Sequence, residues 1–165
     1  MEEICMDRVN EIIKNEEYDF NLNKIGELEA DRKFCRHDLT HFLDVARICM
    51  LICMDERIEI DRELIYAAAL LHDIGRARQY LESIAHEEAS AEIAKKILED
   101  AGFFGKENDE IIEAIREHGN EKIKGRKDLT GVLYRADKLS RKCFKCSASN
   151  ECHKSNDKKN MWVFY

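Results

Sequence analysis

Apolar residues recur at helical spacing along most of the chain, and short polar or glycine-containing segments separate these stretches. The spacing predicts two amphipathic helices near the N-terminus, over residues 2–15 (apolar from Ile4 to Ile13) and 17–30. It predicts four further helices. They run over residues 38–54, over the residues that end at the pair 72–73, over 84–101 and over 110–118. A last helix is predicted over 129–142. Residues 77–84 fit either a short helix or a loop. The chain is therefore predicted to be all-α, with about six or seven helices.

Residues 67–76, AAALLHDIGR, are the stretch around which the others are organised. The three alanines allow neighbouring helices to approach closely, and the two leucines supply apolar bulk. The helix then ends in His72 and Asp73, and Gly75 is a residue typical of a helix C-terminus. A carboxylate in an apolar setting is costly unless it is paired or bound to a metal, and His and Asp are both metal ligands. A polar pair at a frayed helix end is the alternative.

Other histidines and one aspartate occupy similar positions at helix ends or on apolar faces. His41 shares a face with Val45 and Ile52, and His118 closes an apolar face just before a glycine. His86 lies in the first turn of a helix, and Asp137 lies among apolar neighbours. Each has a purely structural explanation when taken singly. Because six such groups come from five segments, a common metal site is favoured over six unrelated structural roles.

Composition and charge narrow the function further. The chain has 165 residues, no proline and seven glycines, which favours one helical domain. Its net charge of −7 argues against a nucleic-acid polymer as partner, although bound divalent metals would still attract a small anion. The polar N-terminus and the absence of a bilayer-length apolar run predict a cytoplasmic protein without a membrane partner. Its seven cysteines are then expected as thiols or metal ligands rather than disulfides.

The order His41, His72-Asp73 and Asp137 resembles the HD-domain metal-dependent phosphohydrolases. This resemblance implies an HD-domain/phosphodiesterase-like helical bundle. Residues 1–30 would form N-terminal packing helices, 31–142 the metal-binding catalytic core, and 143–165 a cysteine-containing tail docked on the same single domain.

The resemblance also implies roles for individual residues. It selects His41 over His37 as a ligand, so that His41, His72, Asp73 and Asp137 would hold a first divalent ion. Asp73 would bridge to a second ion completed by His86 and His118. The ions, one or two in number, would be Mn, Fe, Ni, Co, Mg or Zn, and a metal-activated water would be the nucleophile.

Four charged or polar side chains near these ligands are candidates for other roles. Arg76 is expected to contact phosphate, because its guanidinium matches phosphate oxygens. Lys138 is a weaker candidate, and a solvated surface charge is the alternative for both. His37 and Arg36 are expected to support a ligand or to touch the substrate.

The expected function is hydrolysis of a phosphomonoester, a phosphodiester or a nucleotide, with a small nucleotide-like substrate. Two alternatives stay open: a diiron oxygenase of the HD fold, and a non-catalytic nucleotide-sensing module. The apolar residues 161–165 are expected to dock on the domain or on a second subunit of a homo-oligomer.

A second metal motif follows the catalytic region. Cys143, Cys146 and Cys152 have the spacing Cys-x2-Cys-x5-Cys, which suggests structural zinc or, less strongly, an iron–sulfur cluster. The fourth ligand would be His153, or Cys35 if the tail folds back. Reduced thiols without a metal are the alternative.

Overall fold

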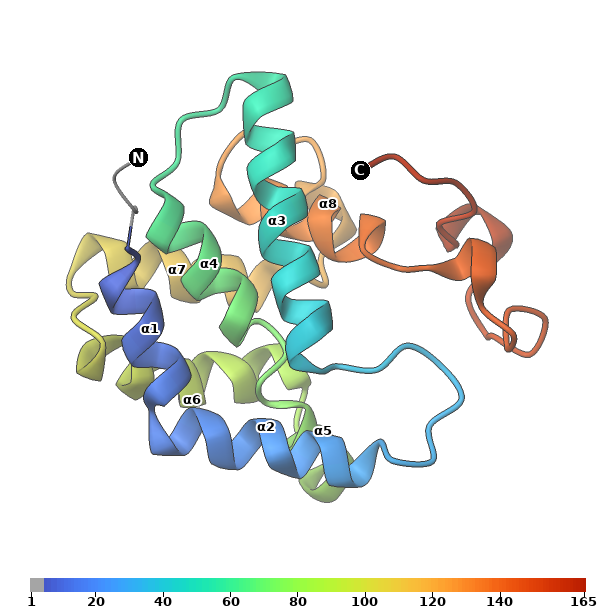
Figure 1. Cartoon of the computed structure of the whole chain (residues 1–165), viewed down its shortest axis with the longest axis horizontal. Helices are drawn as coiled ribbons and strands as arrows, with labels where there is room; N and C mark the ends of the chain where they lie inside the picture. The colour runs from blue at the N-terminus through green and yellow to red at the C-terminus, as the bar shows by residue number, and fades with distance from the viewer. Residues whose placement is uncertain (1–4) are drawn as a thin grey trace.

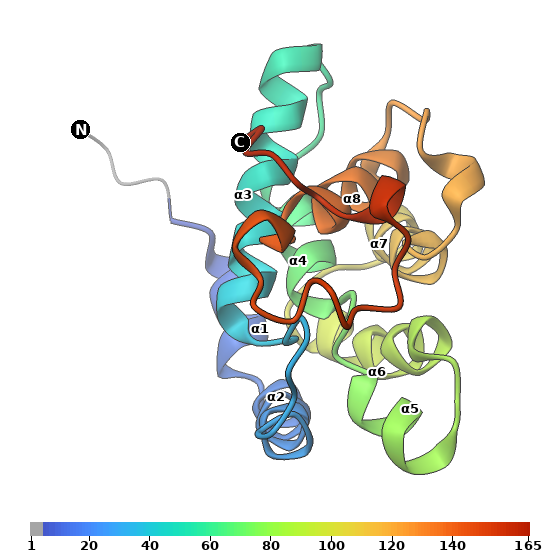
Figure 2. The same ribbon diagram turned by 90° about the vertical axis from the view of Figure 1, so that its right-hand side faces the viewer.

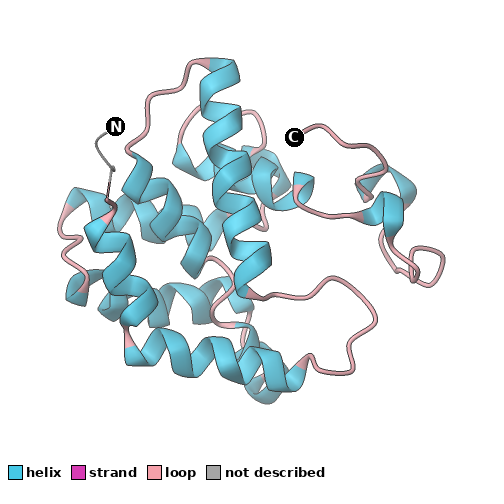
Figure 3. Ribbon diagram, viewed as in Figure 1, coloured by secondary structure: helices cyan, strands magenta, loops and turns pink. Residues whose placement is uncertain are grey.

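The computed structural model describes residues 5–165, and none of these residues lies in a strand (Figure 3). The α-helices are α1 (Asp7–Lys14), α2 (Glu16–Leu28), α3 (Leu39–Glu56), α4 (Arg62–Leu71), α5 (Arg76–Glu82), α6 (His86–Asp100), α7 (Lys106–Glu117) and α8 (Leu129–Leu139). The described residues also form three short 3-10 helices: η1 (Glu121–Ile123) before α8, and η2 (Cys143–Lys145) and η3 (Asn156–Lys158) after it. The all-α prediction is confirmed, and α5 resolves the choice between helix and loop. The predicted position of Ile4 lies outside the described residues.

The central helix is α4, which packs against α3, α7 and α8 (Figure 1). Its predicted apolar stretch, residues 67–71, is completely buried. Helix α3 packs chiefly against α4 and α8, and α7 lies between α6 and α8. Cys49 and Cys53 are buried in the core, as small apolar residues would be.

Aspartate caps fix where three of the central helices begin. Asp38 accepts a hydrogen bond from the backbone N–H of His41, Asp61 caps α4 and Asp128 caps α8. Asp38 therefore sets the start of the helix that carries His41.

Two predicted helix boundaries are wrong. Gly75 does not end α4; it is the N-cap of α5, at φ −85°, and the turn at residues 72–75 joins the two helices. Helix α7 begins at Lys106 after Gly105, rather than at the predicted residue 110. Asn108 is buried within the helix, where its side chain donates to the carbonyl of Phe103.

The C-terminal segment, residues 143–165, folds back across the open side of the bundle. Figure 2 shows its red trace in front of α3, α4 and α8. The Asn160 side chain fastens it by donating to the carbonyls of Leu139 and Arg141, at 2.7 and 2.9 Å. Among the described residues, no helix combines the length and apolar character needed to cross a membrane.

Candidate metal centre

Six side chains from different helices and helix ends converge on one place in the bundle. His41 is in the first turn of α3, His72 is the C-cap of α4, and Asp73 follows in the turn. His86 opens α6, His118 is the C-cap of α7, and Asp137 lies in α8. Donor atoms lie within 4.8 Å of one another in two groups that share Asp73: His41, His72, Asp73 and Asp137, and Asp73, His86 and His118.

The two carboxylate oxygens of Asp73 face different groups. Oδ2 lies 3.2 Å from His72 Nε2 and 3.9 Å from His41 Nε2. Oδ1 lies 3.3 Å from His86 Nε2 and 3.5 Å from His118 Nε2. One carboxylate is thus placed between two sets of imidazole nitrogens.

Backbone hydrogen bonds set the tautomers of two of these imidazoles. His72 Nδ1 donates to the carbonyl of Ala69 at 2.7 Å, and His118 Nδ1 donates to the carbonyl of Ile115 at 2.6 Å. When neutral, each of these rings therefore turns an unprotonated Nε2 toward Asp73. His118 Nε2 is also 3.2 Å from His86 Nε2.

The carboxylate of Asp137 divides its oxygens between the centre and two cations. Oδ1 faces His41 Nε2 at 3.6 Å and His72 Nε2 at 3.9 Å. Oδ2 accepts from Lys138 Nζ at 2.5 Å and from Arg141 Nη2 at 3.3 Å. The two cations hold the outer oxygen and leave the inner one for the centre.

Burial and charge fix the protonation states of the centre. Burial lowers the pKa of His41 to about 4 and that of His86 to about 3. Burial alone would raise the pKa of both carboxyls. Arg76 and His72 nevertheless hold the pKa of Asp73 well below its usual value, and Lys138 and Arg141 do the same for Asp137. At neutral pH His41 and His86 are therefore neutral, and Asp73 and Asp137 are ionised, which are the forms that bind metal.

The donor set fits a divalent cation. His41 Nε2 and His72 Nε2 are buried and make no hydrogen bond in the protein, and such nitrogens are rarely left without a partner. Imidazole nitrogens and carboxylate oxygens at this spacing are ligands for first-row transition metals. The fold, the donors and their protonation states thus support divalent metal binding at this place.

The two proposed phosphate contacts are both tied to proposed ligands. Arg76 Nε donates to Asp73 Oδ1 at 2.8 Å, and its Nη1 donates to Gln79. Lys138 bonds to Asp137 and to the carbonyl of His118. Both side chains also line the pocket beside the centre. Arg36 lines the same pocket, and its Nη2 donates to the carbonyl of Ala30.

His37 lies beside the centre but outside both groups of donors. Glu29 Oε1 lies 2.6 Å from His37 Nδ1, and Nε2 points toward Asp73 Oδ2 at 3.7 Å. Glu29 also accepts from the hydroxyl of Tyr80. Sequence reasoning missed Glu29 and Tyr80, because no local pattern distinguishes them from surface residues. It also gave Arg141 no role, although its spacing of four from Asp137 on a helix was a usable signal.

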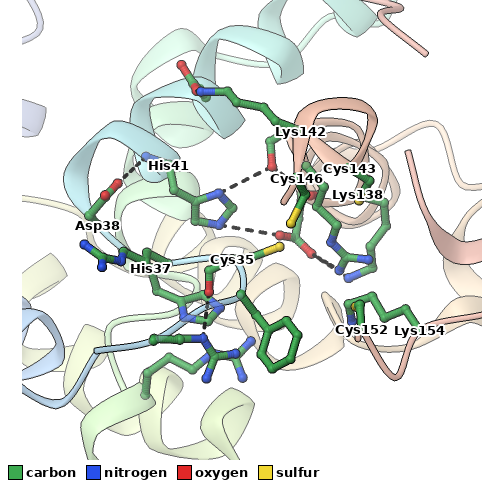
Figure 4. A pocket seen from close by; sticks show the side chains of 18 of the residues that line it. Cys35, His37, Asp38, His41, Lys138, Lys142, Cys143, Cys146, Cys152 and Lys154 are labelled. Carbon is green, nitrogen blue, oxygen red and sulfur yellow. Dashed lines mark hydrogen bonds and ion pairs between the residues drawn. The ribbon is translucent and has the colours of Figure 1, made fainter. Parts of the chain in front are cut away.

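A cavity of about 650 Å³ opens beside the centre, between α3, α8 and the C-terminal segment. Figure 4 shows His41 and His37 on one side of it and Lys138, Cys143, Cys146 and Lys154 on the other. Its lining contains three aspartates and nine basic residues, namely Arg32, Lys33, Arg36, Arg76, Lys138, Arg141, Lys142, Lys145 and Lys154. The wall is therefore cationic although the whole chain carries −7.

The cysteines of the second predicted site also lie together. Cys35, Cys143, Cys146 and Cys152 line one small cavity at the edge of the larger one. His153 lines only the large cavity. Among the described residues, the sulfur atoms of these cysteines do not all lie within 4.8 Å of one another, unlike the donor atoms of the His and Asp groups.

Comparisons with known proteins find relatives of this chain. The family model of the HD domain matches residues 38–142. An uncharacterized protein of Clostridium beijerinckii is 42% identical over 160 residues, which cover 97% of this chain and 100% of that one. Ribonuclease Y of Lawsonia intracellularis is 30% identical over 116 residues, 70% of this chain and 20% of the ribonuclease. The chain thus spans about a fifth of that ribonuclease's length.

A solved structure has the same fold. The crystal structure of a predicted HD superfamily hydrolase from an uncultured Thermotogales bacterium matches with a TM-score of 0.63 and 26% identity. The match covers 88% of this chain and 80% of that one. It therefore includes most of the bundle that positions the six donors.

Proposed function

We propose that this chain, which belongs to the HD-domain family, hydrolyses phosphoester bonds by means of divalent ions held at the six-residue centre. The observation that carries the proposal is the placement of Asp73, whose two oxygens face separate sets of imidazole nitrogens. A carboxylate in that position can bridge two ions. His41, His72 and Asp137 would complete one site, and His86 and His118 the other.

Divalent ions bound there would supply a Lewis acid that activates water and neutralises charge on the phosphate. The chain itself provides no serine or cysteine nucleophile among the six donors. Its contribution is to hold the two carboxylate donors ionised, through Arg76 next to Asp73 and Lys138 with Arg141 next to Asp137.

The basic wall of the large cavity supports a phosphorylated substrate. Nine cationic side chains against three carboxylates would attract a small anion and bind its oxygens. A cavity of about 650 Å³ is within the usual range for small-molecule sites and would accommodate a nucleotide.

His37 would hold the proton that the leaving group needs. In hydrolysis, water oxygen bonds to phosphorus, the ester P–O bond breaks, and the departing oxygen takes up a proton. The Glu29 carboxylate at Nδ1 orients the ring, and Nε2 points into the cavity beside Asp73. We assign His37 the role of carrying that proton at Nε2.

Among phosphoesters, the diester is the favoured class. Two of the relatives are named ribonuclease Y, a name that denotes cleavage of RNA, whose linkages are phosphodiesters. A small nucleotide-like diester combines that chemistry with the size and charge of the cavity.

The test is a hydrolysis screen with chelator-treated protein reloaded separately with manganese, iron, nickel, cobalt, magnesium or zinc. Substrates are bis(p-nitrophenyl) phosphate, p-nitrophenyl phosphate, cyclic nucleotides, dinucleotides and a single-stranded RNA. We expect metal-dependent release of product from the diesters, abolished in Asp73→Ala and retained in Asp109→Ala, an exposed aspartate on α7 outside the cavity lining.

Three outcomes would overturn the proposal. Activity retained in Asp73→Ala would remove the centre from catalysis. Consumption of oxygen that depends on ferrous iron and an organic substrate would identify an oxygenase. Tight nucleotide binding without turnover under every metal would identify a sensing module.

A further inference from the structure

We propose that Cys35, Cys143, Cys146 and Cys152 bind one structural zinc ion, which fastens the C-terminal segment to the loop before α3. This site is separate from the His and Asp centre and does not rest on the proposed reaction. Its four thiols come from distant parts of the sequence and line one small cavity (Figure 4).

The fourth ligand is Cys35 rather than His153. Cys35 lines the small cavity together with the three cysteines of the tail, because the tail folds back over the start of α3. His153 is exposed and faces the larger cavity instead. The donor set is therefore four cysteines, a set that structural zinc sites commonly use.

The small cavity has room for a single ion. Its volume is about 20 Å³, close to the space that one water-sized sphere requires. An iron–sulfur cluster carries several iron and sulfide atoms and would not fit. The thiols surround the cavity without closing on one point, so binding would draw the sulfurs inward to about 2.3 Å from zinc.

The local backbone favours binding of one ion by two of the thiols. Cys143 begins the 3-10 turn η2, and the backbone N–H of Cys146 donates to the carbonyl of Cys143 at 3.2 Å. The turn keeps the first two cysteines of the motif on one short loop. Cys152 follows through further turns at residues 147–151.

Charge around the cavity would compensate a zinc–tetrathiolate centre. On binding, the four thiols release four protons, which leaves a net charge of −2 on the zinc and its ligands. Lys154 and Lys159 line the same cavity. No carboxylate is among its lining residues, so the two ammonium groups would face the thiolates.

The tail needs such a link because it has almost no core of its own. In residues 143–165, only Cys143 and Ala148 are buried apolar residues, and the described regular structure is limited to η2 and η3. Segments with so little buried apolar surface usually require a metal or disulfide to hold one conformation. The ion pair between Lys33 and Glu151 joins the same two segments but is exposed, and so contributes little.

The proposed ion would also shape the large cavity. The same four cysteines line that cavity beside Lys154. Fixing the tail would therefore fix one wall of the space above the His and Asp centre.

The test uses cobalt as a spectroscopic probe in the full chain. Chelator-treated protein is titrated with Co²⁺, and absorption from thiolate-to-cobalt charge transfer is recorded, which nitrogen and oxygen ligands do not produce. We expect this absorption in the wild type and in Asp73→Ala, and its displacement by one equivalent of zinc. Cys146→Ser and Cys152→Ser should weaken it severalfold, whereas Cys5→Ser, which removes an exposed thiol outside the cavity, should leave it unchanged.

A second measurement needs no variant and is unaffected if a substitution prevents folding. Thiol alkylation of the wild type, mapped by mass spectrometry with and without zinc, should show joint protection of the four cavity cysteines and none of Cys5. Absence of cobalt–thiolate absorption in the wild type, its undiminished intensity in Cys146→Ser, unprotected cavity thiols, or iron and sulfide at this motif would each overturn the proposal.

Discussion

Arg76 Nε donates a hydrogen bond to Asp73 Oδ1 at 2.8 Å, on the same oxygen that faces His86 and His118. The guanidinium is three residues beyond the aspartate, in the first turn of α5, and it is largely buried. Arg76 therefore keeps Asp73 ionised and oriented before any substrate arrives. A phosphate contact through its remaining N–H groups would be an additional role.

Replacing Arg76 should weaken both metal binding and hydrolysis. Arg76→Met removes the hydrogen bond to Asp73, and loss of such a supporting contact typically costs about 10–100-fold in metal affinity or activity. Arg78→Met is the matched control, because Arg78 lies on the same helix and pairs with Glu82 and Glu92 at the surface. Metal titration and kcat/KM measure both variants, and equal effects would contradict a specific role for Arg76.

Gly75 is required by a close approach between two backbones. A Cβ atom there would collide with the backbone N of Ser90 and the backbone carbon of Ala89 in α6. Gly75→Ala should therefore lower the free energy of unfolding by about 1–3 kcal/mol, the usual cost of overpacking. Gly26→Ala, with nothing within 4 Å of the new Cβ, should be neutral or stabilising by less than about 1 kcal/mol. Urea unfolding measures the free energy of unfolding of both variants. Similar values for the two would contradict the packing argument.

The contact between Glu29 and His37 should make stability depend on acidic pH. Burial by itself would raise the pKa of Glu29, but hydrogen bonds from His37 and Tyr80 lower it from 4.5 to about 2. A depressed carboxyl pKa adds stability above the unfolded value, and this is lost as pH falls from about 4.5 toward 2. The contribution is on the order of 3 kcal/mol.

Denaturant unfolding as a function of pH checks this contribution. Across that acidic window, Glu29→Gln should lose less stability than the wild type, since its amide does not titrate. Parallel curves for the two proteins would show that Glu29 is not coupled to folding in this way. Glu27→Gln, on the exposed end of α2, is the control and should follow the wild type.

His37 should affect turnover more than metal binding. His37→Asn keeps a polar side chain but removes the proton carrier, and general acid–base groups typically contribute about 100–10,000-fold to rate. We expect kcat to fall while manganese affinity changes little. The effect should be smallest for diesters with a p-nitrophenol leaving group, which needs little help from a proton. Loss of manganese binding in this variant would instead make His37 a structural support of the centre.

Local patterns predicted the helices and the six donors, because each donor lies at a helix end or on an apolar face that the sequence displays. The start of α7 was mispredicted because Gly105, at φ 54°, begins it without a side-chain cap. The contact between Glu29 and His37 depends on how α2 folds back. The contact between Cys35 and the tail cysteines depends in the same way on the C-terminal segment. Such long-range contacts leave no periodic signal, so the sequence left the fourth cysteine ligand open.

The central claim is that Asp73 joins two groups of donors into one centre for divalent ions. Manganese binding measures this most directly, because Mn²⁺ prefers nitrogen and oxygen donors and would not report the thiol cavity. Calorimetric titration of the chelator-treated chain should show binding in the wild type and in Asp109→Ala, and none in Asp73→Ala. Unchanged manganese binding by Asp73→Ala, in a protein that keeps its helical circular dichroism, would contradict the account.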